Sequence, residues 1–392
     1  MIKILGNIVT NDGIISDGEI CFSGGKTIYV GKKRENDFDF EVIDYRDKYI
    51  SSGFTDIHVH GGGGFDFTDG TEEAFIKIGE FHATHGTATM LPTTLSCSDE
   101  ELISLFETFK KVQNSGYNGA YFPGIHIEGP YCAISQKGAQ DEKYIRIPSP
   151  DHYNKILEYS DLIKRWTIAP ELSGAIELGK ILCQKGIVPS IGHSDALYED
   201  ALEAFENGFT LMTHFYSGMS SMTRKNGFRY PGLIEAGYMI EDINVEIIAD
   251  GCHLPISILS YLYKSKGPDK ICLCTDGMRA AGQTDGYSIL GSLDNGYKVV
   301  IEDGVAKLMD RSAFAGSVAT SDRLVRTMYK NANVPLVDAI KMITCNPCKM
   351  ANIKNKGYLE AGFDADYTIF DDDINIYCVY SNGRKVYENV SC

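Results

Sequence analysis

Short apolar runs alternate with amphipathic segments through the middle of the chain, residues 51–350. In the amphipathic segments apolar residues recur every three or four positions, which is typical of helices packed on one face. The apolar runs are 56–60, 88–94, 123–130, 165–170, 188–193, 211–215, 245–251 and 270–277. Eight buried strands alternating with helices predict an α/β fold and favour a closed, parallel (β/α)₈ TIM-like barrel. An open doubly wound sheet is the alternative, but no Gly-x-Gly-x-x-Gly follows an early strand.

The two ends of the chain carry a different pattern. Residues 1–50 and 355–392 hold short runs of β-branched and aromatic residues, broken by turns rich in Asn, Asp and Gly. This pattern predicts that both ends meet in one small β-sandwich domain, with a barrel of residues 51–354 inserted between them. A further interruption at about 283–310 contains Asn-Gly and Asp-Gly turns, which predict a β-hairpin flap over one end of the barrel.

The most informative stretch is SSGFTDIHVHGGGGFD, residues 51–66. We expect one buried strand from Tyr49 to Val59 that runs into the glycine loop. His58 and His60 stand at its end, and residues two apart on a strand point to the same face. Two imidazoles on one face suit a metal site, and the alternative is a pair of structural histidines. Their position directly before four glycines favours metal ligands.

Other ionisable residues also stand at the C-terminal ends of predicted strands. They are Glu128, His193, His214 and Asp276. In a parallel barrel these strand ends share one mouth, so the side chains would converge with His58 and His60. Buried together without a cation they would be costly, and we therefore predict one or two divalent metal ions. Such ligands suit Zn²⁺ best in our interpretation, while Fe²⁺, Mn²⁺ and Co²⁺ stay open because ligand softness does not decide among them.

The ligand types indicate hydrolytic chemistry. A divalent ion lowers the pKa of a bound water to about 7 and polarises a carbonyl group. A free carboxylate beside that water can accept its proton and pass it to a leaving amine. Asp276, on the last strand, is the predicted base, and the alternative is a structural acid that caps the next helix. His126 shares a face with Glu128 and is expected to support the ligands or to belong to the core, not to bind a metal itself. His253 is expected to contact the substrate.

Composition narrows the possible partners and compartment. The chain has 392 residues, 43% hydrophobic and 23% charged, with a net charge of −16. This acidic balance argues against nucleic acid or an anionic membrane surface as the main partner. No apolar run reaches the length of a membrane span, and the first residues lack the features of a signal peptide, so we expect a cytoplasmic protein. Eleven cysteines are scattered and do not indicate a disulfide framework.

Seven segments together resemble the amidohydrolase superfamily, and within it the branch that deacetylates N-acetylglucosamine 6-phosphate. The segments are GFTDIHVHGGGGFDF (53–67), HIEGPY (126–131), GHSDA (192–196), THFYSGM (213–219), ADGCH (249–253), TDGMRAAG (275–282) and FAGS (314–317). They follow the family's order along essentially the whole chain. HIEGP together with ADGCH and TDGM is specific to the deacetylase branch, whereas the His-x-His pair alone would indicate only the superfamily.

The resemblance implies a metal site with two parts. Glu128, His193 and His214 would hold the main ion. His58 and His60 would allow a second ion, with Glu128 bridging the two.

The resemblance also implies roles for residues outside the metal site. Asp276 would act first as base and then as acid, and His253 would contact the sugar. Arg229, in FRYPG, would reach the substrate phosphate bound by the neighbouring subunit, which implies a homodimer. A guanidinium suits that role because its fork can bind a phosphate through two hydrogen bonds.

The chain shows three departures from the family's pattern. Gln140 stands where the family usually has a His that helps to polarise the acetyl carbonyl. Ser217 and Gly218 stand in place of Asn-Ala, in a loop expected to cradle the phosphate. Gly277 replaces a common Ala, which is a mild change. The first two departures bear on the substrate and the rate, and they leave the expected metal chemistry intact.

The function that the resemblance implies is removal of the acetyl group from N-acetylglucosamine 6-phosphate, giving glucosamine 6-phosphate and acetate. One alternative is deacetylation of another amino sugar, either N-acetylgalactosamine 6-phosphate or an unphosphorylated N-acetyl sugar. Another is hydrolysis of an N-acyl-D-amino acid or a cyclic amide. A non-catalytic scaffold is disfavoured, because such proteins usually lose the metal ligands that this chain retains.

Overall fold

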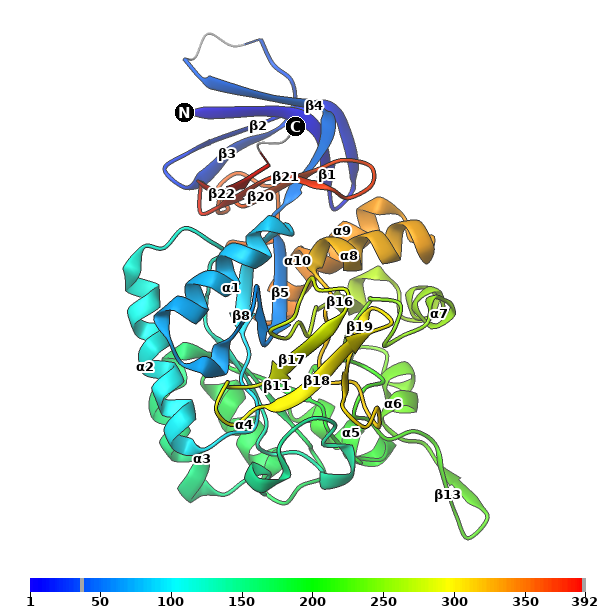
Figure 1. Ribbon diagram of the computed structural model, residues 1–392. Coiled ribbons are helices and arrows are strands. Elements are labelled where there is room, and N and C mark those ends of the chain that lie inside the picture. Colours follow the sequence, from blue (N-terminus) through cyan, green and yellow to red (C-terminus); the bar gives the residue numbers. More distant parts are fainter. Residues whose placement is uncertain (36–38, 390–392) are drawn as a thin grey trace.

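The computed structural model describes residues 1–35 and 39–389, which form a mixed α/β molecule with two parts (Figure 1). The larger part contains a six-stranded parallel sheet, in the order β16-β15-β12-β11-β10-β9, and the parallel pair β5-β8. These strands are β5 (Phe54–Val59), β8 (Thr87–Pro92), β9 (Ile125–Glu128), β10 (Ile163–Ile168), β11 (Val188–Ile191), β12 (Leu211–Met212), β15 (Asn244–Ile247) and β16 (Ile271–Leu273). Each overlaps one of the predicted apolar runs, so the prediction of these strands is confirmed.

Helices connect the strands and cover the outside of the larger part (Figure 1). They are α1 (Glu72–Thr84), α2 (Asp99–Ser115), α3 (Pro150–Ile156), α4 (Ala175–Gln184), α5 (Tyr198–Glu206), α6 (Leu233–Met239), α7 (Ile256–Lys266), α8 (Ser321–Arg326), α9 (Leu336–Ile343) and α10 (Cys345–Met350). Helix α2 shows how the sequence sets their ends. Ser98 and Glu101 form a capping box at its start, and Gly116 ends it with a left-handed φ of 69°.

Backbone contacts also link the two parallel sheets at their edges. Thr93, just after β8, pairs with His126 on β9 in a parallel bridge. Val59, at the end of β5, pairs in the same way with Gly277, beyond β16. The amide of His60 donates to the carbonyl of Gly277 at 2.8 Å. These contacts bring the C-terminal ends of β5, β9 and β16 to the same end of the molecule.

The smaller part contains strands from both ends of the chain in one seven-stranded sheet, in the order β22-β21-β20-β4-β1-β2-β3 (Figure 1). The strands are β1 (Ile2–Thr10), β2 (Gly13–Ser23), β3 (Lys26–Lys32), β4 (Glu41–Ser52), β20 (Tyr367–Phe370), β21 (Ile376–Ser381) and β22 (Arg384–Glu388). Phe22 of β2 packs against Tyr367 of β20 and Tyr380 of β21, with ring centroids 5.3 Å apart in both pairs. These strands are not neighbours in the sheet, so the sheet curves around a core of its own.

The single strand predicted from Tyr49 to Val59 is in fact two strands. β4 ends at Ser52 in the seven-stranded sheet formed by both ends of the chain (the terminal sheet), and β5 begins at Phe54 beside β8. Gly53 joins them where the backbones approach closely, since a Cβ atom there would lie 2.4 Å from the Cβ of Ala88. The prediction was wrong because continuous apolar character does not reveal where a strand changes its partner.

The segment predicted as a β-hairpin forms three antiparallel strands, β17 (Gly286–Leu290), β18 (Tyr297–Glu302) and β19 (Val305–Leu308). Arg279 connects this sheet to the glycine loop that follows His60. Its guanidinium donates to the carboxylate of Asp69 at 2.6 and 2.8 Å, to the carbonyl of Gly291 at 2.9 Å and to that of Gly64 at 3.0 Å. A charged group with several such partners holds these segments in a fixed relative position.

Among the described residues, no helix has both the length and the apolar character needed to cross a membrane.

Candidate active site

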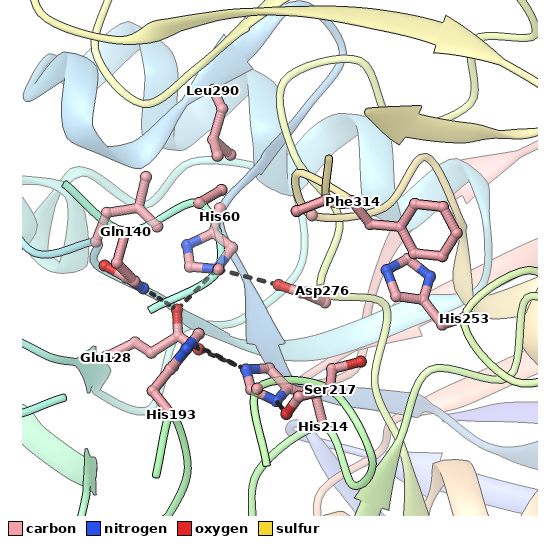
Figure 2. Close-up of a pocket in the computed structure, with 16 residues that line it drawn as sticks. His60, Glu128, Gln140, His193, His214, Ser217, His253, Asp276, Leu290 and Phe314 are labelled. Carbon is pink, nitrogen blue, oxygen red and sulfur yellow. Dashed lines mark hydrogen bonds and ion pairs between the residues drawn. The ribbon is translucent and has the colours of Figure 1, made fainter. Parts of the chain in front are cut away.

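A cavity of about 240 Å³ lies at the C-terminal ends of the parallel strands (Figure 2). Most of the residues singled out in the sequence line it: His60, Glu128, Gln140, His193, His214, Ser217, Gly218, His253 and Asp276. His58 is fully buried and contacts this group. Leu290 of β17 and Phe314 complete the wall in Figure 2, so the three-stranded sheet contributes to the cavity.

Glu128, at the end of β9, lies at the centre of the polar cluster. Its Oε1 atom is 3.1 Å from Nε2 of His193, 3.0 Å from Nε2 of His214 and 3.3 Å from Nε2 of His58. Its Oε2 atom is 3.3 Å from Nε2 of His60. One carboxylate therefore contacts all four of the histidines that the sequence singled out at strand ends.

Asp276 lies on the His58 and His60 side of this cluster. Its Oδ1 atom is 3.1 Å from Nε2 of His60 and 3.4 Å from Nε2 of His58. Asp276, His193 and His214 have positive φ angles of 48°, 49° and 31°, which non-glycine residues rarely adopt. Such conformations cost roughly 1–3 kcal/mol each and cluster at functional sites, where the surrounding structure holds them in place.

The hydrogen bonds of His193 and His214 determine which ring nitrogen carries the hydrogen and which one presents a lone pair to the cluster. Nδ1 of His193 is 2.8 Å from the carbonyl of Gln136, and Nδ1 of His214 is 3.1 Å from the carbonyl of Ser217. A carbonyl oxygen only accepts, so each Nδ1 carries the hydrogen and each neutral ring presents a lone pair at Nε2.

These lone pairs provide a test of whether the residues fit a metal ion. The Nε2 atoms of His193 and His214 are 3.2 Å apart, and both lie beside Oε1 of Glu128. Three such atoms repel one another unless a positive charge lies among them. In the free protein burial opposes a charged His193, but the Glu128 carboxylate outweighs this and raises the pKa of that imidazole. Imidazole and carboxylate donors suit a divalent metal ion, so the residues fit one.

Gln140 supports Glu128 in this arrangement. Its Nε2 atom donates to Oε2 of Glu128 at 2.8 Å, and its Oε1 atom accepts from the amide of Ser96 at 2.7 Å. These two contacts set the orientation of the side-chain amide. Gln140 therefore holds the central carboxylate through the oxygen that His193 and His214 do not contact, while it also lines the cavity.

His253 and the loop of Ser217 and Gly218 form another part of the wall. The Nδ1 atom of His253 is 2.9 Å from Oδ2 of Asp250, so this ring can offer Nε2 to a ligand. A Cβ atom at Gly218 would lie 3.0 Å from Nδ1 of His193, and its φ is 56°. The glycine at this position therefore allows the loop to pass close to a candidate metal ligand.

Arg229 does not reach this cavity within its own chain. It lies on β14 (Phe228–Tyr230), which pairs with β13 (Thr223–Lys225) in an exposed hairpin. Figure 1 shows this hairpin extending away from the rest of the molecule. Its turn, Asn226-Gly227, has φ angles of 51° and 87°, as a tight hairpin turn requires.

Two residues next to the site were missed in the sequence. Arg165 on β10 and Glu246 on β15 are both fully buried and form an ion pair. The signal that could have revealed them is a charged residue within a strand predicted to be buried, because a buried charge requires a partner. Oε1 of Glu246 also lies 2.8 Å from Nδ1 of His58.

Histidines and carboxylates gathered at the strand ends of an α/β fold, around one cavity, define a metal-dependent hydrolase. The chain belongs to the amidohydrolase family, whose model matches residues 49–386. The family predicted from the sequence motifs is therefore confirmed.

Several proteins that are similar to this chain are named for the same activity, the deacetylation of N-acetylglucosamine 6-phosphate. The chain is 33% identical over 345 residues to the N-acetylglucosamine-6-phosphate deacetylase of Lysinibacillus sphaericus, covering 86% of this chain and 85% of that protein. It is 31% identical over 387 residues to the enzyme of the same name from Bacillus subtilis, covering 96% and 94%. A mutant of the Mycobacterium smegmatis deacetylase, solved in complex with N-acetyl-D-glucosamine 6-phosphate, has a TM-score of 0.89 at 26% identity, covering 98% of this chain and 99% of that one.

Proposed function

We propose that this chain is a metal-dependent deacetylase that converts N-acetylglucosamine 6-phosphate into glucosamine 6-phosphate and acetate. The observation that carries the proposal is the convergence of Glu128, Asp276 and four histidines at one cavity. A relative named for this activity aligns with nearly the whole length of the chain. The product amine and acetate follow from hydrolysis of the amide bond.

We also propose a finer description of the fold. The eight parallel strands close into a (β/α)₈ barrel of residues 51–354, which the bridges from β8 to β9 and from β5 to the segment after β16 support. Residues 1–50 and 355–392 form a small β-sandwich, supported by the packing of Phe22 on Tyr367 and Tyr380. The sheet of β17, β18 and β19 serves as a flap, because Leu290 lines the cavity.

In the proposed metal site Glu128, His193 and His214 hold one ion, and His58 and His60 contribute to a second. Glu128 lies between the two groups of histidines, because its Oε1 atom contacts His193, His214 and His58 and its Oε2 atom contacts His60. A bound divalent ion polarises the acetyl carbonyl and lowers the pKa of a water. We propose Zn²⁺, whose usual ligands match this set, although Fe²⁺, Mn²⁺ and Co²⁺ accept the same donors.

Asp276 transfers the proton in the proposed reaction. Burial disfavours its charged form, but His58 and His60 outweigh this effect and keep its pKa below the usual range. The carboxylate is therefore ionised near neutral pH and ready to accept a proton from the attacking water. The same group then gives that proton to the leaving nitrogen, so that the sugar departs as an amine. His253 and the loop of Ser217 and Gly218 position the sugar phosphate.

We propose that the enzyme is a homodimer in which the β13–β14 hairpin reaches the neighbouring active site. Arg224 and Arg229 are directly opposite each other in this exposed hairpin. Like charges in that position repel unless an anion lies against them. An exposed pair of arginines therefore suits a phosphate that the other subunit binds.

Replacing Arg229 with alanine tests this arrangement. We expect KM for the phosphorylated substrate to rise by about 10–100-fold with kcat little changed, because one charge-assisted contact contributes about 1.5–3 kcal/mol. Hydrolysis of the unphosphorylated sugar should not change. Lys225→Ala removes another exposed positive charge from the same hairpin and is the matched control. Equal effects of the two changes, or an equal loss with both substrates, would contradict the specific role of Arg229.

The function itself is tested by measuring acetate release from a panel of N-acetyl hexosamines, with and without a 6-phosphate, on protein of known metal content. We expect N-acetylglucosamine 6-phosphate to have the highest kcat/KM, and we expect a chelator to abolish the activity and added Zn²⁺ to restore it. Faster turnover of N-acetylgalactosamine 6-phosphate, an unphosphorylated sugar, an N-acyl-D-amino acid or a cyclic amide would replace the proposed substrate.

A further inference from the structure

We propose that Glu246 is a positioning residue that makes the second metal position possible. It does so by holding His58 in one tautomer and one orientation, and it is itself held by Arg165. This inference rests on the proposed metal-dependent function and assigns a role to a buried ion pair that contacts neither the cavity nor a substrate.

The contact between Glu246 and His58 fixes which nitrogen of His58 can bind a cation. Oε1 of Glu246 is 2.8 Å from Nδ1 of His58, and both side chains are fully buried. An ionised carboxylate only accepts, so Nδ1 carries the hydrogen, and Nε2 is the nitrogen left to offer a lone pair to a cation. That Nε2 atom lies 3.3 Å from Oε1 of Glu128 and 3.4 Å from Oδ1 of Asp276.

The Nε2 atom of His58 has the environment of a metal ligand. Within the described residues it is buried and makes no hydrogen bond, although two carboxylates lie close to it. Buried polar atoms are nearly always satisfied, so such an atom indicates a missing partner. A cation that binds the two carboxylates and this lone pair would satisfy all three.

Arg165 keeps the Glu246 carboxylate in place. Its Nη1 atom contacts Oε2 of Glu246, Nε donates to Oγ of Ser190 at 2.9 Å, and Nη2 donates to Oγ1 of Thr213 at 2.8 Å. The guanidinium therefore contacts residues of β11 and of the loop after β12 as well as Glu246. This rigid support leaves Oε1 of Glu246 directed at His58.

The effect of Glu246 should be larger for the second metal position than for the first. Its Oε1 atom also accepts from the backbone amide of His214 at 3.1 Å. The ring of His214, however, is oriented separately by the carbonyl of Ser217. Loss of the Glu246 carboxylate would thus release the ring of His58 while the ring of His214 keeps its own anchor.

Glu246→Gln tests the proposal because it preserves size but changes the hydrogen bonding. Arg165 is the stronger partner and attracts the amide oxygen, so the amide NH₂ turns toward Nδ1 of His58. His58 must then accept at Nδ1 and carry its hydrogen on Nε2, where it blocks a metal ion. Full-length protein is dialysed against graded Zn²⁺, and bound zinc is counted per chain. We expect two ions in the wild type and, in the variant, a second ion bound about 10–100-fold more weakly with the first unchanged.

A double variant keeps the test valid if Glu246→Gln fails to fold. Arg165→Met with Glu246→Leu replaces both buried charges with apolar side chains, and folded proteins often tolerate such a paired replacement. The double change also removes the acceptor for Nδ1 of His58. We expect this folded protein to bind only the first ion tightly. The matched control is Glu19→Gln, which alters a buried carboxylate paired with Arg34 in the terminal sheet and should leave both ions bound.

The outcomes separate this inference from the proposed function. If the wild type binds two ions and both Glu246 variants also bind two with the same affinity, the role of Glu246 is wrong and the deacetylase function stands. If the wild type binds only one ion and releases acetate, the second position is wrong and the function again stands. If the wild type binds no zinc and releases no acetate, the proposed function itself fails.

Discussion

Replacing Asp276 with asparagine is expected to lower kcat by about 10²–10⁴-fold, the range that a general acid–base group contributes. The amide has nearly the same shape but cannot accept a proton from water and return it to the leaving nitrogen. The first metal ion should remain bound, because Glu128, His193 and His214 are unaltered. The second should bind more weakly, since Oδ1 of Asp276 lies 3.1 Å from His60.

Two measurements check this result, the rate of acetate release and the zinc content of the same preparation. The pH dependence of kcat in the wild type should also contain an acidic limb that the variant lacks, because protonated Asp276 cannot act as base. Asp338→Asn is the matched control, on α9 and outside the cavity, where the carboxylate accepts a hydrogen bond from Tyr263. A wild-type rate in Asp276→Asn would rule out the proposed proton transfer.

Replacing Glu128 with glutamine should have the second large effect, the loss of both metal ions and of nearly all activity. Its two oxygens contact four histidines, and an amide offers one weaker acceptor in their place. Gln140 donates to one of these oxygens and would face an NH₂ group if the new amide took the wrong orientation. A polarising metal ion is worth several kcal/mol to the transition state, so we expect an activity loss of about 10³-fold or more.

The measurement is zinc content together with thermal stability at increasing Zn²⁺. Wild-type protein should gain stability as zinc is added, because only the folded state binds it, and Glu128→Gln should gain little. Glu101→Gln makes the same chemical change in the capping box of α2 and should keep its metal and activity. Full zinc content in Glu128→Gln would contradict its central place in the site.

The sequence predicted a large share of the site because of how parallel strands are arranged. His58, His60, His193, His214 and Asp276 could each be assigned to the end of an apolar run. In a parallel sheet all such ends lie at one edge, so their convergence did not require knowledge of the helices or loops. The structure places these side chains within a few ångströms of Glu128 or of one another.

The remaining features depend on contacts between residues far apart in the chain. The ion pair of Arg165 and Glu246 joins residues on β10 and β15, and neither charge indicates its partner in the sequence. Arg229 is exposed and does not line the cavity of its own chain, and this too depends on the path of the hairpin.

The sequence by itself determined the order of strands and helices and the chemical identity of the candidate metal ligands, because periodicity and strand ends are local properties of the chain. Only the tertiary structure decided where the strand before His58 changes partner at Gly53, which residue holds His58, and which ring nitrogens face Glu128. These features are set by close packing and by single hydrogen bonds, whose geometry exists only when distant segments meet. The pair His58-Val-His60 was visible in the sequence, but its contact with Glu246, on which the proposed role of His58 depends, was not.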